Sequence, residues 1–270
     1  MAGWFPCAVG ALGLVRCVAT AWSQASPTTM STHADSVPRH HLSLDGGRLR
    51  PVQLTYRTAI RRDSVESFVG VSHVQVAETT YAGMPAWLLT RLGPQGTTTA
   101  TDSLVVARAD LRPLHWTATL GVARLAAEFT PDTIFAAMSS PLGRQSIVVG
   151  NRGDLLVSTG AMDAALAVMP LSVGWRDSAS VLVIDGGGAA IAPAYLIVES
   201  EEHLTAPAGE FDCWIVSVET ERATERIWVS KLDQTVVRSE QILPQLASAV
   251  LERVLVQADT SLPPAAIRQP

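Results

Sequence analysis

Three ionisable side chains in one short segment are the first candidates for chemistry. Glu199, Glu201 and His203 alternate along the run of residues 194–204, which also contains Glu202. If this run is a strand, the first three side chains share one face and Glu202 lies on the other. Carboxylates beside a histidine are suited to general acid–base catalysis, as in a hydrolase. We favour the plainer interpretation, in which these residues form the solvated end of a strand.

A second candidate is Asp185, which is followed by Gly186 and Gly187 after an apolar run. This order resembles the strand and turn of retropepsin-like proteases, but those enzymes place Thr or Ser where Gly186 stands. Asp-Gly is the strongest short signal for a hairpin turn, and we expect a turn here. The sequence also has no Gly-x-Ser-x-Gly elbow, so we expect no catalytic residue.

Histidines near the N-terminus are the only candidate metal ligands. His33, His40 and His41 lie close together with Asp35, in a segment rich in Ser, Thr and Pro. A zinc site needs three or four ligands on a fixed frame, which such a segment does not provide. We therefore expect no metal and no cofactor. The net charge of −5 and the pI near 5.7 also argue against a nucleic-acid partner.

The elements that position all these residues are predicted to be strands. Apolar and polar side chains alternate over residues 114–120 and 125–129, as in strands with one buried face. Turn residues recur between such runs, for example at 93–96 and 151–153. The pattern predicts a mostly β fold, an antiparallel meander that forms a curved sheet, a half-barrel or a barrel.

One short helix is predicted near residues 162–169. Good helix formers fill this segment, and Pro170 ends it. We expect Asp163 to cap the helix or to stabilise its first turn.

Large apolar side chains are the candidates for lining a cavity beneath this helix. In a curved sheet they would enclose a space with the helix across its mouth, whereas in a filled core they would only occupy volume. The candidates are Trp87, Trp116, Met162, Leu166, Met169, Trp214 and Trp228.

The N-terminal residues 1–25 have the features of a secretory signal. An apolar stretch, residues 8–21, precedes small residues up to Ala25, although no basic residue precedes it and Arg16 interrupts it. The stretch is too short to span a bilayer, so we expect no transmembrane segment in the mature chain. Cys17 lies in a sequence that faintly resembles a lipobox, and its lipidation stays open. We expect cleavage near Ala25 and a periplasmic or secreted protein.

Three further segments complete the predicted organisation. Residues 26–50 are expected to be a flexible lead-in, 51–260 a single β-rich domain, and 261–270 a tail. Cleavage would leave Cys213 as the only cysteine, so no internal disulfide is expected.

Three motifs carry a resemblance to a known family. Ala206-Pro207-Ala208-Gly209-Glu210-Phe211, then Ile227-Trp228-Val229-Ser230 and Val237-Arg238, resemble the motifs of a family of periplasmic proteins of unknown function. That family is in turn similar to the lipoprotein-sorting carriers, which fold as an incomplete antiparallel β-barrel with helices that close a hydrophobic cavity. The resemblance implies an exported half-barrel that holds an acyl chain or another apolar group, and it carries over no catalytic residue.

These observations lead to one functional hypothesis with two alternatives. The first is an exported cell-envelope protein that binds a hydrophobic or lipidic ligand without catalysis. The alternatives are a structural or assembly module that pairs with an envelope protein partner, and a hydrolase of unknown substrate that uses Glu199, Glu201 or His203.

Overall fold

The structure consists of strands joined by short turns, with one α-helix. This computed structural model describes residues 42, 44–95, 98–141, 143–151, 155–185, 188–221, 223–243 and 246–261. These residues contain a 3-10 turn, η1 (Gly46–Arg48), the helix α1 (Ser158–Leu166) and fifteen strands. The strands are β1 (Val52–Arg62), β2 (Val65–Tyr81), β3 (Met84–Gln95), β4 (Thr98–Ala107), β5 (Pro113–Leu120), β6 (Ala123–Phe129), β7 (Thr133–Ser140), β8 (Gly143–Gly150), β9 (Leu155–Val157), β10 (Arg176–Asp185), β11 (Gly188–Ala206), β12 (Gly209–Thr220), β13 (Thr224–Ser230), β14 (Val236–Leu243) and β15 (Ala249–Asp259).

Several expectations fall on residues outside these ranges. They are the signal at 1–25, the histidines at 33, 40 and 41, and nearly all of the predicted tail at 261–270.

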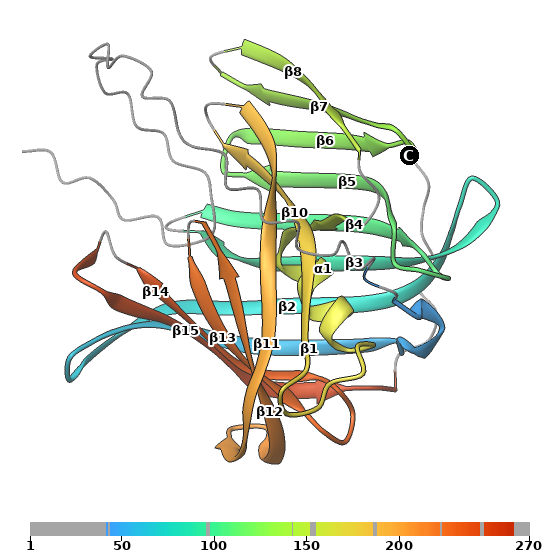
Figure 1. The fold of residues 1–270 in the computed structure, drawn as a ribbon. Helices are drawn as coiled ribbons and strands as arrows, with labels where there is room; N and C mark the ends of the chain where they lie inside the picture. Colours follow the sequence, from blue (N-terminus) through green and yellow to red (C-terminus); the bar gives the residue numbers. More distant parts are fainter. Residues whose placement is uncertain are drawn as a thin grey trace, which may run out of the picture.

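All fifteen strands belong to one sheet (Figure 1). Its order is β8-β7-β6-β5-β4-β3-β2-β1-β15-β14-β13-β12-β11-β10-β9, so each half of the chain forms a meander. The two meanders join where β1 pairs with β15, and only the β9–β10 pair is parallel among the described strands. The prediction of a mostly antiparallel, curved sheet with one short helix is confirmed. The sheet does not close into a barrel.

The sheet curves until its second half lies across its first (Figure 1). Register shifts occur in several ladders, including those at Thr58/Ala59, Val198/Ser200 and Trp228/Val229. Such bulges bend a strand and increase its twist. As a result β11 contacts β8, β9 contacts β5, and α1 packs between the halves against β3 and β9.

Apolar side chains from both halves and from α1 form the main core. Leu104 and Ile134 from the first half meet Leu196 and Ile227 from the second, around Leu166 of the helix. All five side chains are almost fully buried. Burial of these side chains is the main term that holds the two meanders together.

Helix α1 begins four residues before the predicted segment and ends three residues earlier. It follows β9 directly, and Val157 at its N-cap provides no side-chain hydrogen bond. The expectation that Asp163 caps the helix or stabilises its first turn is therefore wrong, because Asp163 lies too far along the helix. Packing of the helix against the sheet replaces the missing cap. In the described part of the chain, no helix has the length and apolar character needed to cross a membrane.

The last residues of the predicted flexible lead-in are packed against the sheet. Asp45 caps η1 by accepting a hydrogen bond from the Gly47 amide, and Trp87 Nε1 donates to the Gly46 carbonyl at 2.9 Å. A Cβ atom at Gly46 would lie 2.3 Å from the carbonyl oxygen of Arg108, so only glycine permits this approach. The ordered domain therefore begins before Val52, in the part of the lead-in that was expected to be flexible.

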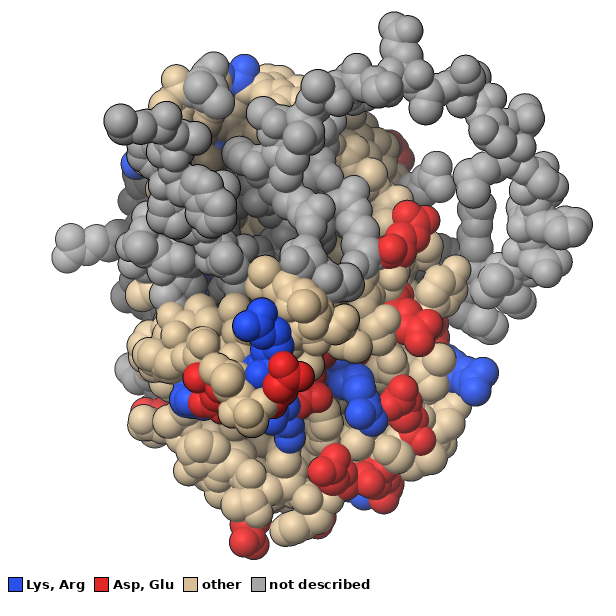
Figure 2. Space-filling model, turned by 90° about the vertical axis from the view of Figure 1, so that its left-hand side faces the viewer, with Lys and Arg blue, Asp and Glu red and all other residues tan. Residues whose placement is uncertain are grey.

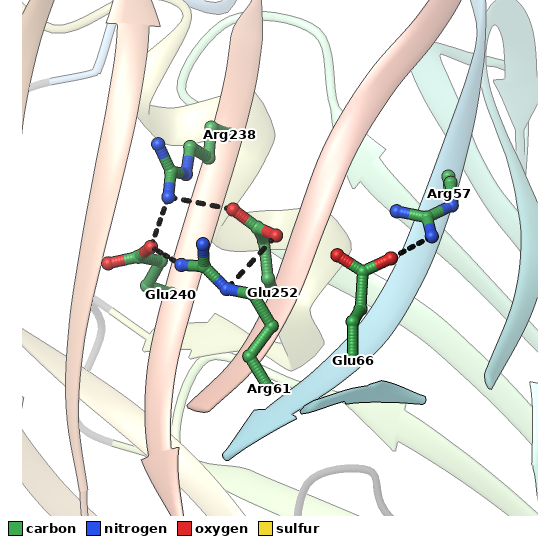
Figure 3. Close-up of polar contacts among 6 residues, drawn as sticks. All are labelled: Arg57, Arg61, Glu66, Arg238, Glu240 and Glu252. Atoms are coloured by element: carbon green, nitrogen blue, oxygen red, sulfur yellow. Dashed lines mark hydrogen bonds and ion pairs between the residues drawn. The ribbon is translucent and has the colours of Figure 1, made fainter. Parts of the chain in front are cut away.

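An ion-pair network joins the two meanders on the face of the sheet turned away from α1 (Figure 3). Arg61 of β1 reaches Glu240 of β14 at 2.5 Å and Glu252 of β15 at 3.3 Å. Arg238 pairs with the same two carboxylates, at 2.7 Å to Glu252. Because each charge has two partners, we assign this network a structural role at the junction of the halves.

Candidate ligand-binding cavity

A cavity of about 520 Å³ lies between α1, strands β1–β4 and the turn that joins β13 to β14. Its volume is within the range of small-molecule sites, roughly 300–1,000 Å³. The lining residues are Arg48, Leu49, Arg50, Val52, Leu54, Tyr56, Val74, Val76, Leu89, Thr90, Arg91, Asp102, Leu104, Gly160, Asp163, Ala164, Ala167, Lys231, Leu232, Asp233, Gln234, Thr235, Val236, Ala258 and Thr260.

The sheet supplies an aliphatic wall. Leu54 pairs with Val74 across β1 and β2, and Val76, Leu89 and Leu104 form one row across β2, β3 and β4. Residues on one face of adjacent strands lie side by side, so these five side chains form a continuous apolar surface. We call this surface the aliphatic wall.

The helix supplies the opposite side through small residues. Gly160, Asp163, Ala164 and Ala167 line the cavity. Their spacing of three and four residues places them on one face of α1. Because three of the four carry at most a methyl group, this face leaves space between helix and sheet.

A buried ion pair fixes the helix over the sheet. Arg253 of β15 donates two hydrogen bonds to Asp163, at 2.8 and 2.9 Å, and its side chain is only 5% exposed. The guanidinium lies 4.6 Å from the ring centre of Tyr56, whose hydroxyl donates to the Val236 carbonyl at 2.8 Å. Burial opposes the charged form of Arg253, but the charge and hydrogen bonds of Asp163 outweigh it and leave the Arg253 pKa above its usual value.

A second arginine, Arg91, enters the cavity from β3. Cross-strand pairing places it between Val74 and Asp102. Burial, followed by repulsion from Arg253, lowers the pKa of the Arg91 guanidinium. Burial likewise raises the pKa of Glu225, a carboxyl group whose charge acts on both arginines. The space beneath α1 is thus apolar along the wall and strongly charged at one side.

Residues before β1 and after β13 form the rim. Arg48 donates to the Val168 carbonyl at 3.0 Å and to Gln234 Oε1 at 3.4 Å. Gln234 in turn donates to the Met169 carbonyl at 3.3 Å. These bonds connect the lead-in and the β13–β14 turn to the chain that follows α1.

Comparison with known proteins identifies the family. Residues 69–244 match the family described as "Protein of unknown function (DUF3108)". The chain belongs to the DUF3108 family. The matched range covers α1, β3–β14 and most of β2 in this DUF3108 protein, whereas β1, which also lines the cavity, and β15 lie outside it. No match is found among curated proteins.

Two solved structures are similar to this DUF3108 chain at low identity. One is a protein assigned as exported, with a YmcC-like fold, from Bacteroides fragilis NCTC 9343 (9% identity, TM-score 0.35). The other is a protein assigned as a lipoprotein from Parabacteroides distasonis ATCC 8503 (12% identity, TM-score 0.34). Each comparison covers 80% of this chain and 99% of the other.

None of the tryptophans predicted to line a cavity is among the residues that line this one. Trp87 is buried in the main core on the same face of β3 as Leu89, beside the wall, and Trp116 donates from Nε1 to the lining residue Asp102 at 2.5 Å. Trp214 packs against the main core. Trp228 lies on the outer face beneath Arg238, whose guanidinium is 4.8 Å from the ring centre. Their role as ligand contacts stays a prediction.

The predicted lining residues of the helical segment, Met162, Leu166 and Met169, are also buried in the main core. The missed residues were the small ones on the other face of α1. Their signal is present in the sequence as Gly160, Ala164 and Ala167 at helical spacing. Large side chains fill space, so small residues mark a cavity better than large ones do.

The acid–base candidates each have a separate partner. Glu199 pairs with Arg226 at 3.1 Å and Glu201 with Lys231 at 2.5 Å. His203 contacts Asp212 at 2.9 Å, and this hydrogen bond raises the His203 pKa.

Charges of both signs are mixed on the face of the molecule drawn in Figure 2. On the described part of the face drawn there, Lys and Arg side chains alternate with Asp and Glu side chains. Among the described residues, no group of three or more His, Cys, Asp or Glu side chains is arranged to hold a metal ion.

Proposed function

We propose that this chain is an exported, non-catalytic binding protein that holds a hydrophobic or lipidic ligand between α1 and the sheet. The observation that carries the proposal is the cavity of about 520 Å³ with its aliphatic wall. Burial of a ligand's hydrocarbon against that wall would contribute roughly 25 cal/mol for each Å² removed from water. The signal-like residues 1–25 support an envelope location.

The arrangement of ionisable groups supports binding rather than catalysis. Asp163 and Arg253 bind each other in the closed, two-bond geometry of a structural pair. Glu199 and Glu201 are each paired with a different cation. A hydrolytic role would need a nucleophile or an activated water beside such groups.

A direct test is ligand binding with the cavity open and with the cavity filled. The purified protein is analysed by native mass spectrometry and lipid extraction, and then titrated with two sixteen-carbon probes, palmitate and hexadecanol. The variant Ala167→Trp adds a large side chain at the helix face of the cavity. Its matched control, Ala126→Trp, adds the same side chain at an exposed position of β6.

We expect the wild-type protein and Ala126→Trp to bind at least one probe with similar affinity. The affinity of Ala167→Trp should fall about 5- to 150-fold, because forcing side chain and ligand into one space costs roughly 1–3 kcal/mol. A protein that carries no extractable lipid and binds neither probe would overturn the proposal. Equal affinities of the two variants would place the ligand elsewhere.

A further inference from the structure

The cations that line the cavity differ in how their charges are satisfied. Lys231 pairs with Glu201, which lies outside the lining. Arg48 donates to a backbone carbonyl and a side-chain amide, and Arg50 donates to the carbonyls of its neighbours in the chain. Within the described residues, neither of these two arginines is hydrogen-bonded to a carboxylate.

Arg91 is the cation placed deepest against the sheet. It projects from the middle of β3, in the row that contains Leu54 and Val74 of the aliphatic wall. Three carboxylates act on its charge, and each has another partner, since Asp163 holds Arg253, Asp102 accepts from Trp116 and Glu225 is hydrogen-bonded to Ser239. Within the described chain, the Arg91 guanidinium likewise has no hydrogen-bonded carboxylate.

A desolvated guanidinium in this position would gain from an anion that it binds directly. Burial disfavours its charged form and Arg253 repels it, and the attraction of Asp163, Asp102 and Glu225 does not fully offset these two effects, so the Arg91 pKa stays lowered. Its five N–H donors match the geometry of a carboxylate or phosphate group, which can accept two of them together. An anion that enters the cavity would relieve both the desolvation and the repulsion.

We propose that the ligand of this cavity is an anionic amphiphile, with a carboxylate or phosphate head on Arg91 and a hydrocarbon chain along the aliphatic wall. The inference rests on the proposed function and adds the chemical class of the ligand. Arg48 and Arg50 provide positive potential at the rim, where an anionic head enters. The wall residues Val76, Leu89 and Leu104 continue from Arg91 along the neighbouring row of the sheet.

The test compares three probes with the same sixteen-carbon chain, namely palmitate, hexadecyl phosphate and hexadecanol, in the full-length protein. Inorganic phosphate serves as an anion without a chain. The variant is Arg91→Gln, and the control is Arg144→Gln, which removes the same charge from an exposed position of β8. Circular dichroism and thermal melting establish that each variant is folded.

We expect the wild-type protein to bind palmitate or hexadecyl phosphate at least tenfold more tightly than hexadecanol. In Arg91→Gln the dissociation constant of the anionic probes should rise about 10- to 100-fold, the effect of losing hydrogen bonds to a charged group. That of hexadecanol should change less than threefold, and Arg144→Gln should resemble the wild type. If Arg91→Gln does not fold, Arg91→Lys provides the same comparison, since it keeps the charge and loses the two-bond geometry.

The outcomes separate this inference from the proposed function. Hexadecanol that binds as tightly as the anionic probes overturns the role of Arg91 and leaves an apolar ligand site. Inorganic phosphate that competes as well as hexadecyl phosphate overturns the amphiphile in favour of a free-anion site. An Arg91 variant that weakens all three probes equally shows a structural role for this side chain, and absence of binding by every probe overturns both proposals.

Discussion

Removal of the Asp163 carboxylate should destabilise the fold strongly, because it leaves a buried charge unpaired. Asp163 is the only ionisable residue of α1, and its side chain is 11% exposed. The Arg253 side chain, at 5%, is enclosed beneath the helix. Asp163→Ala removes the partner of that cation, and breaking such a pair costs about 3–5 kcal/mol.

The matched control is an exposed ion pair in the same sheet. Glu66 pairs with Arg57 between β2 and β1, and the two side chains are 41% and 39% exposed. Glu66→Ala should cost about 0–1 kcal/mol, because water already screens this pair. For a chain of this size, each kcal/mol shifts the melting temperature by roughly 2–4 °C, so Asp163→Ala should lower it by roughly 6–20 °C.

Urea unfolding followed by tryptophan fluorescence measures these differences in free energy. The double variant Asp163→Ala/Arg253→Met removes both charges, and it should be more stable than Asp163→Ala alone. Two results would contradict the reasoning. One is a cost for Asp163→Ala no larger than that for Glu66→Ala, and the other is a double variant whose cost equals the sum of its single substitutions.

Three further predictions follow from individual side chains. Burial raises the Glu225 pKa, so the folded chain retains a proton that the unfolded chain releases, and the contribution of Glu225 to stability falls as the pH rises above the ordinary value of 4.5. The urea midpoint of Glu225→Gln, measured between about pH 4 and 7, should therefore rise relative to that of the wild type as the pH rises. A constant difference between the two midpoints would contradict this. Burial raises the pKa of the Cys213 thiol to about 11, so mass spectrometry should find the peptide containing Cys213 alkylated by iodoacetamide only after denaturation. Asp212→Asn should lower the His203 pKa, as followed by NMR of the imidazole, because the hydrogen bond to that carboxylate raises it; an unchanged titration would remove Asp212 as the cause.

The pattern of the sheet could be predicted from the sequence because it is local. Alternation over residues 114–120 and 125–129 depends on the period of an extended chain, and both segments are strands, β5 and β6. The short helix was expected for a similar reason, from residues with good helix propensity before Pro170. The boundaries of α1 differ from the predicted ones because the helix follows β9 without a cap and is held by packing against the sheet.

The candidate site could not be predicted in the same way, because it depends on contacts between distant segments. Asp163 and Arg253 are separated by 90 positions. The helical period shows that Gly160, Ala164 and Ala167 share a face, but it does not show which face meets the sheet.

The sequence by itself determined that alternating side chains form an antiparallel sheet with one short helix, because each strand buries one face whatever its neighbours are. Only the tertiary structure decided where space remains, since a cavity is the volume that two packed surfaces leave unfilled. In this protein the curvature of the sheet brings β1–β4 opposite the small-residue face of α1, and the Asp163–Arg253 pair holds the helix there.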